Sequence, residues 1–117
     1  MMSALQVLAE RILVGARGWV EAVIIASPDG TPIAYNSKIG INPDSVAAVV
    51  AAIGGAATAT VDLLGSDGYD RIDLRLSDRR YLLVRRHGNN YIVCVTRPDP
   101  NLGFINLVLD ALLSKGT

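Results

Sequence analysis

The chain has 117 residues, 50% of them apolar, with a mean hydropathy of +0.35, and its 11 basic and 11 acidic residues give a formal net charge of zero. This length predicts one domain, and the balanced charge argues against a dedicated nucleic-acid binder, which needs a basic excess. A small chain this apolar is expected to cover part of its surface with another subunit, because small domains have much surface for their volume.

The first part of the chain predicts a helix followed by a hairpin. Apolar residues recur at helical spacing through residues 3–15, which indicates an amphipathic helix. Residues 20–27 are nearly all apolar, as in a central strand that is covered on both faces. The turn sequence Pro-Asp-Gly then leads into a short strand at 33–36, and Pro32 at its start suits the edge of a sheet.

A long helix with no charged side is expected next. Asn42 is a good N-cap, Pro43 suits the first helical position, and the helix should end at Leu64 before Gly65. At about 100° per residue its bulky residues form one stripe, which we expect to lie on the chain's own sheet. This stripe comprises Val46, Val49, Val50, Ile53, Ala57, Thr60, Val61 and Leu64.

The rest of that helix surface is almost entirely small residues, where a monomer would place Glu, Lys or Arg. We therefore expect a helix of a second subunit to pack there, with Gly54 and Gly55 at the point of closest approach. The alternative is an alanine-rich helix that simply faces water.

The second part of the chain predicts three strands and a last helix. Residues 69–76 alternate strictly between apolar and charged, residues 81–86 and 91–96 are further strands, and residues 102–115 form a helix. The order is α-β-β-α-β-β-β-α, and most strand connections are hairpins. The expected fold class is therefore α+β, with a five-stranded antiparallel sheet and helices on both faces.

The third strand is expected to join the subunit interface if it lies at a sheet edge, because edge strands have free backbone groups. A two-fold axis at Asp73 would place that carboxylate opposite its own copy, whereas an axis at Ile72 or Leu74 pairs it with Arg71 or Arg75 of the other subunit. The expected dimer interface comprises Ala47, Ala48, Ala51, Ala52, Gly54, Gly55, Thr58, Asp62, Arg71, Asp73 and Arg75.

No group of residues predicts catalysis, a metal site or a cofactor site. His87 is the one histidine and lies in a turn sequence, while Cys94 lies in the apolar run YIVCV and is expected to be a buried core thiol. The chain has neither a phosphate-binding glycine loop nor a nucleophile motif. We therefore expect a protein that is not an enzyme.

An excess of arginine marks the segment from Tyr69 to Arg86, which holds six arginines and three aspartates. This charge either solubilises the strands and a hairpin tip or docks a partner, and the sequence leaves both open. Four of these arginines follow the third strand, and their role stays open: Arg79, Arg80, Arg85 and Arg86.

The chain also lacks a pattern typical of secretion or membrane insertion. Its N-terminal segment has no basic start and contains Glu10 and Arg11, unlike a signal peptide. The apolar stretch between Asp44 and Asp62 consists largely of the weakly hydrophobic Ala and Gly. We expect a cytoplasmic protein with no direct membrane insertion.

The element order and three segments resemble the roadblock-type dynein light chain family. The segments are VEAVIIASPDGTPIAYN (Val20 to Asn36), the alanine-rich helix after NPDS, and NLGFINLVLDALL (Asn101 to Leu113). The resemblance covers nearly the whole chain and implies one roadblock-like domain over residues 1–117. It also implies a dimer joined through the second helix and third strand into one ten-stranded sheet.

The same resemblance implies a function as a non-enzymatic platform for a small Ras-like GTPase, or for motor and signalling complexes. A bacterial member of the family activates its GTPase without inserting an arginine finger. We expect a homodimer, or a heterodimer with a paralogue, that binds and regulates such a GTPase. The alternative is a longin- or profilin-like interaction or ligand-sensing module, with a cavity between the last helix and the sheet.

Overall fold

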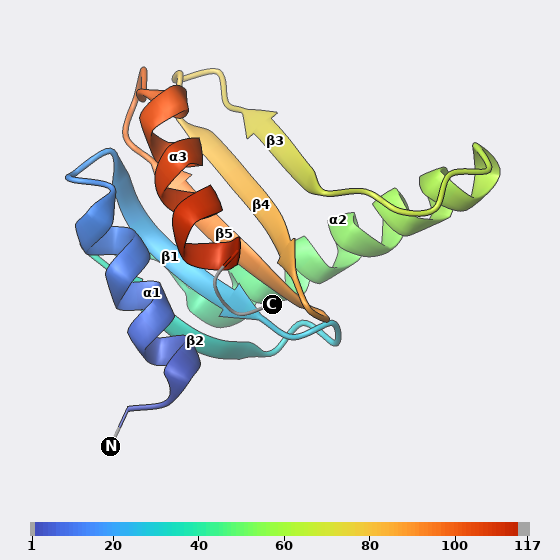
Figure 1. The fold of residues 1–117 in the computed structure, drawn as a ribbon, viewed down its shortest axis with the longest axis horizontal. Coiled ribbons are helices and arrows are strands. Elements are labelled where there is room, and N and C mark those ends of the chain that lie inside the picture. Colours follow the sequence, from blue (N-terminus) through green and yellow to red (C-terminus); the bar gives the residue numbers. More distant parts are fainter. Residues whose placement is uncertain (1, 115–117) are drawn as a thin grey trace.

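The computed structural model describes residues 2–114 and contains the predicted elements in the predicted order (Figure 1). They are α1 (Ala4–Gly15), β1 (Val20–Ala26), β2 (Pro32–Ser37), α2 (Pro43–Leu63), β3 (Arg71–Arg75), β4 (Tyr81–His87), β5 (Asn90–Thr96) and α3 (Leu102–Leu113). The expected end of the last helix, at residue 115, lies outside the described residues.

The five strands form one antiparallel sheet in the order β2-β1-β5-β4-β3. The two strands that are apolar on both faces, β1 and β5, occupy its centre, and nearly all their residues are buried. Strands β2 and β3 are the two edges. The sequence-based α+β fold class is therefore confirmed.

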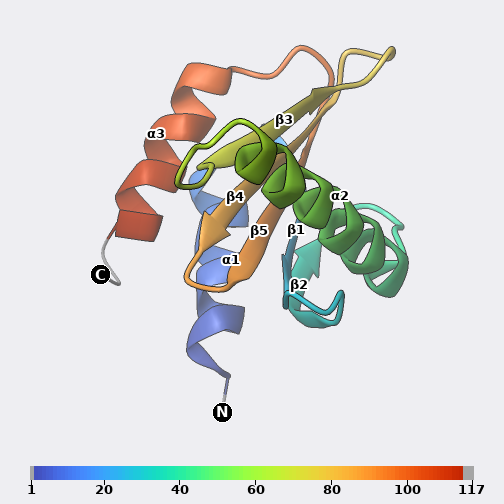
Figure 2. The same ribbon diagram turned by 90° about the vertical axis from the view of Figure 1, so that its right-hand side faces the viewer.

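Helices cover both faces of the sheet (Figure 2). Helices α1 and α3 lie on one face, over a core that includes Ile12, Ile92 and Leu109. Helix α2 lies on the other face, over a second core that includes Ile24, Val84 and Val93. The alternation of side chains along the central strands thus supplies two separate apolar cores.

Side-chain caps fix the start of each helix. Ser3 accepts the N–H of Gln6, Asn42 accepts the N–H of Ser45, and Asn101 accepts the N–H of Phe104. Each cap satisfies a backbone donor that has no partner within its helix. Pro43 follows the Asn42 cap at the first helical position, as predicted.

Candidate interaction surface

Helix α2 faces the sheet with a side that overlaps the predicted one but is turned towards Ala47 and Gly54. Its fully buried residues are Ala47, Val50 and Gly54. Of the expected bulky stripe, Val50 is buried and four more residues are half-buried, namely Val46, Ile53, Ala57 and Val61. Val49 and Leu64, however, are 57% and 78% exposed. The prediction placed the bulkiest residues against the sheet, whereas the small residues Ala47 and Gly54 also lie there.

Gly54 meets Tyr91 of the chain's own sheet, so its expected place at a subunit contact is wrong. A Cβ at Gly54 would overlap the phenol ring of Tyr91, which stands beneath the helix on β5. Gly55 differs from it, since a Cβ there would have nothing within 4 Å. Only the second glycine of the pair lies on open surface.

The turn between β1 and β2 uses further small residues of α2. Gly30 has φ of +87°, and a Cβ on it would lie 3.1 Å from the Cα of Ala48 and 3.5 Å from the Cβ of Ala51. Ala47 is fully buried beside this turn. Ala47 therefore cannot contact another subunit, and the small residues at the start of α2 serve contacts within the chain.

What remains uncovered on α2 is a continuous apolar strip, which we call the outer stripe. Its members lie on one side of the helix and are exposed: Val49, Ala52, Gly55, Ala56, Ala59 and Leu63. Leu63, at the end of the helix, is 87% exposed. The part of α2 that carries these later residues runs past the β3 edge of the sheet (Figure 1).

Among the described residues, α2 is also the one helix that is long and apolar enough to cross a membrane by length and composition. Its most apolar window has a mean hydropathy of 1.8, yet only 17% of that window is buried inside the structure. The contacts of Ala47, Val50 and Gly54 hold the helix against the chain's own sheet. The outer stripe of this helix is therefore exposed apolar surface of the kind that often marks an interaction site.

Strand β3 presents an open edge. Backbone hydrogen bonds join Asp70 to Arg86 and Leu76 to Arg80. The backbone N–H and C=O groups of the even-numbered residues of this strand therefore point towards β4. The N–H and C=O groups of the odd-numbered residues Arg71, Asp73 and Arg75 therefore point away from the sheet. Edge groups of this kind can pair with another strand.

An apolar surface joins this edge to α2. Leu74 is 46% exposed and lies opposite Leu82 on β4. Leu82 in turn lines a shallow groove of about 250 Å³ together with Val46 and Val49 of α2. The groove thus links Leu82, which neighbours Leu74 at the open β3 edge, to Val49 of the outer stripe, and none of its lining residues is charged.

The structure distributes the other expected interface residues as follows. Besides Ala47 and Gly54, which are buried, Ala51 is half-buried. The remaining eight are exposed: Ala48, Ala52, Gly55, Thr58, Asp62, Arg71, Asp73 and Arg75. Arg71 and Asp73 also form an ion pair within β3, with Nε and Oδ2 3.3 Å apart.

A tyrosine cluster, not predicted from the sequence, fastens α2 to the edge of the sheet. The hydroxyl of Tyr69 donates to the carbonyl of Gly54 at 3.2 Å, and the hydroxyl of Thr58 donates to the same carbonyl at 3.1 Å. Arg86 lies over the ring of Tyr69, with 5.0 Å between the guanidinium carbon and the ring centre. Burial, helped by the hydrogen bond with Tyr91, raises the pKa of Tyr69, so its hydroxyl stays protonated and able to donate.

The alternating pattern had placed Tyr69 at the start of the third strand. In the structure Tyr69 precedes this strand, because β3 begins at Arg71. Because its side chain reaches α2, the spacing between α2 and the β3 edge is set within the subunit.

The arginines of the second half do not form one patch. Arg79 and Arg80 lie at the β3–β4 turn and pair with Asp99 at 2.8 Å and Asp78 at 2.7 Å. At the other end of β4, Arg85 binds Asp110 at 3.1 Å and Asn106 at 2.6 Å beneath α3. A local excess of arginine in the sequence is thus divided between two ends and two faces of the sheet.

Cys94 is buried, and burial raises the pKa of its thiol to about 12. Within residues 2–114, no group of three or more His, Cys, Asp and Glu residues could hold a metal ion.

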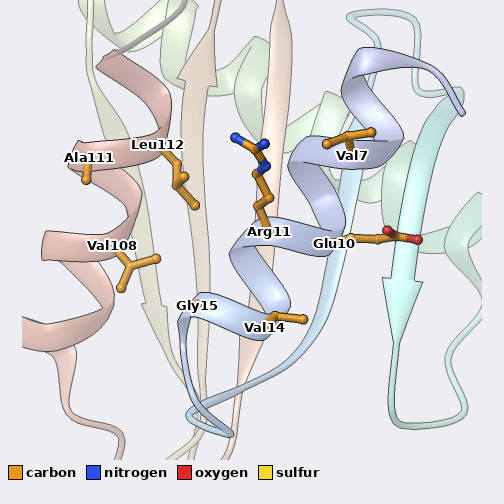
Figure 3. Close-up of a pocket in the computed structure, with 8 residues that line it drawn as sticks. All are labelled: Val7, Glu10, Arg11, Val14, Gly15, Val108, Ala111 and Leu112. Atoms are coloured by element: carbon orange, nitrogen blue, oxygen red, sulfur yellow. The ribbon is translucent and has the colours of Figure 1, made fainter.

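A groove of about 620 Å³ lies between α1 and α3, on the face opposite α2 (Figure 3). Val108 and Leu112 point from α3 towards α1, and Arg11 stands between the two helices. This groove is open and mostly apolar. Its place differs from the cavity between the last helix and the sheet that a ligand-sensing module was expected to have.

Comparison with solved structures supports the fold. MglB from Myxococcus xanthus superposes with a TM-score of 0.86 at 16% identity, over 99% of this chain and 94% of that one. A Roadblock/LC7 domain from Streptomyces avermitilis gives 0.81 at 14% identity, over 97% and 94%. Profilin II from Acanthamoeba castellanii gives 0.59 at 21% identity, over 94% of each chain.

A search of curated proteins found no match. The model of the Roadblock/LC7 domain family matches residues 13–97, which is well over half of the chain. By this match, and with the element order and sheet topology described above, the chain belongs to the Roadblock/LC7 domain family.

Proposed function

We propose that the protein is a non-enzymatic dimeric scaffold, located in the cytoplasm, that binds and regulates a small Ras-like GTPase. The observation that carries the dimer is the apolar surface from the open β3 edge, through Leu74 and Leu82, to the outer stripe of α2. Membership of the Roadblock/LC7 family supports the regulatory role.

In the proposed dimer two β3 strands pair across a two-fold axis and two α2 helices pack below them. Pairing of β3 would satisfy the outward backbone groups of Arg71, Asp73 and Arg75, and the side chains of Ile72 and Leu74 lie on the α2 face of the sheet. One pairing would thus cover both the polar edge and the apolar surface beside it.

Two registers remain in the proposal. An axis at Ile72 places Arg71 of one protomer opposite Asp73 of its partner, and an axis at Leu74 places Asp73 opposite Arg75. In both registers odd-numbered residues face odd-numbered residues, so the outward backbone groups can bond. The interface residues proposed on α2 omit Ala47 and Gly54, which are buried, and add Ala56, Ala59 and Leu63. The full set beside β3 is Ala48, Ala51, Ala52, Gly55, Ala56, Thr58, Ala59, Asp62 and Leu63.

The GTPase role is tested with purified Ras-like GTPases from the same organism, each loaded with GDP or with a GTP analogue. We expect the protein to bind one of them in one nucleotide state and to change its rate of GTP hydrolysis. A variant that cannot dimerise is the matched control, since a scaffold completed by two subunits should lose this effect. Failure to bind any such GTPase in either state would contradict the proposal.

The groove between α1 and α3 favours a second candidate, a profilin- or longin-like module that binds a protein segment or an apolar small molecule. Arg11 and Glu10 at the groove would then orient the bound group. Ala111→Glu would introduce a charge at the groove and should reduce such binding while leaving the dimer and any GTPase effect unchanged.

A further inference from the structure

The edge of the sheet at β2 is occupied by a side chain. Gln6 of α1 donates from Nε2 to the carbonyl oxygen of Tyr35 at 3.0 Å, and its Oε1 accepts the N–H of Tyr35 at 3.3 Å. These are the two hydrogen bonds that a residue of a neighbouring antiparallel strand would make. The side-chain amide of Gln6 thus takes the place of one residue of an added strand.

The position of Gln6 is fixed by the N-cap before it and by the buried part of α1 after it. The hydroxyl of Ser3 accepts the N–H of Gln6 at 3.1 Å, which caps the helix at this residue. Further along α1, Ala9, Ile12 and Leu13 are buried in the core below the sheet. The helix therefore holds the amide of Gln6 at the edge without help from another molecule.

The strand behind Gln6 has the features of one that accepts another strand. Ile33 is 44% exposed and Tyr35 is 48% exposed, so two large apolar side chains stand at this edge. Free backbone groups flanked by exposed apolar side chains are what edge-to-edge association of sheets uses. Without Gln6, Tyr35 would offer its N–H and C=O to a second copy of the same edge.

We propose that Gln6 closes the β2 edge against a second copy of this chain and thereby ends edge-to-edge assembly at the β3 pair. A sheet with two open edges can add copies at both ends without limit, whereas a sheet with one open edge stops at a two-fold pair. The size of the final assembly rests on the proposed β3 dimer, but the closing of the β2 edge does not.

Hydrogen exchange tests the closing itself. At a low protein concentration, where Gln6→Ala does not assemble through β2, its Tyr35 amide should exchange about five- to tenfold faster than in the wild-type protein, because one hydrogen bond is lost at a folded edge. The amide of Ile33 serves as an internal reference, and Arg11→Ala, at an exposed site on the same helix, serves as the control variant. An unchanged exchange rate at Tyr35 would overturn the proposal.

Sedimentation tests the consequence for assembly. Gln6→Ala should form species larger than the wild-type assembly as its concentration rises, and Gln6→Ala with Tyr35→Pro should return to the wild-type size, because proline removes the outward N–H that a strand would bond. A Gln6→Ala protein that keeps the wild-type size at high concentration would refute the stop role. If the wild-type protein proves monomeric, the β3 dimer fails, and the Gln6 proposal then predicts that Gln6→Ala alone dimerises.

Discussion

The two edges of the sheet differ in whether their outward backbone groups are free to pair. At β2, Pro32 begins the strand and the Gln6 amide holds the backbone of Tyr35. At β3, three residues point their backbone groups outward, and apolar surface continues from Leu74 onto α2. A sheet built in this way can pair at one edge and resist pairing at the other, which is how a small domain forms a dimer of defined size.

The largest expected effect comes from a charge on the outer stripe of α2, behind the β3 edge. Ala56→Arg should weaken the dimer about 100-fold, because an unpaired buried charge costs about 3 kcal/mol. Sedimentation velocity over a concentration series measures this change. Ala4→Arg, at an exposed site on α1, is the control and should leave the dimer intact. A dimer that tolerates Ala56→Arg would remove the outer stripe from the interface.

Next in size is a contrast between the adjacent glycines of α2. Gly54→Ala should destabilise the fold by about 1–3 kcal/mol, because its methyl group has no room above Tyr91. Gly55→Ala should instead stabilise the helix by up to about 1 kcal/mol. Any loss of the dimer contact at Gly55 would reduce this gain. Urea unfolding at low protein concentration measures the first effect apart from dimerisation. Equal effects at both sites would show that the assigned orientation of α2 is wrong.

A smaller effect compares the edges directly. Asp73→Pro removes an outward N–H from β3, and Tyr35→Pro removes one from β2, while both leave the bonds to the inner strands in place. Asp73→Pro should weaken the dimer about tenfold, as expected for one or two lost hydrogen bonds. Tyr35→Pro should leave dimerisation as it is. The reverse pattern in sedimentation would place the interface at β2.

The smallest effect distinguishes the two registers. With the axis at Ile72, Arg71→Asp should weaken the dimer by about 0.5 kcal/mol, and with the axis at Leu74, Arg75→Asp should do so. Titrations at low and high salt should show the effect shrinking as charges are screened. Neither register holds if the two variants behave alike.

The sequence predicts the elements well because each is marked locally. Period-3.6 and period-2 patterns, the Asn42 cap, and Pro32 at an edge all depend on residues close in the chain. The face of α2 was predicted in part: most of the bulky stripe does face the sheet, but Ala47 and Gly54 were assigned to the outer side. These two residues are small because of Gly30 of a turn and Tyr91 of the last strand, which lie elsewhere in the sequence. A helical wheel has no information about what lies beneath the helix.

The same limit applies to the contacts that control the edges. Gln6 and Tyr35 are 29 residues apart, and nothing beside either residue marks their pairing. The arginine-rich segment, by contrast, looked like one patch because its members are close in sequence. Successive side chains of a strand point to opposite faces, and Arg85 and Arg86 therefore bind on different sides of β4.

The central claim, that two chains meet through β3, is tested most directly by disulfide formation between introduced cysteines. Residues on a two-fold axis at Ile72 or Leu74 face their own copies at non-hydrogen-bonded positions, where Cα atoms lie about 4.5 Å apart and a disulfide can form. Cys94 can stay in place, because burial and a pKa of about 12 keep it unreactive.

Leu74→Cys, Ile72→Cys and Ile33→Cys should therefore be oxidised in parallel and resolved on non-reducing gels. Ile33 on β2 is a control for exposure alone, since its 44% exposure is close to the 46% of Leu74. We expect rapid covalent dimer from one of the two β3 variants and little from Ile33→Cys. Dimer formation at Ile33 with none at either β3 position would contradict the account.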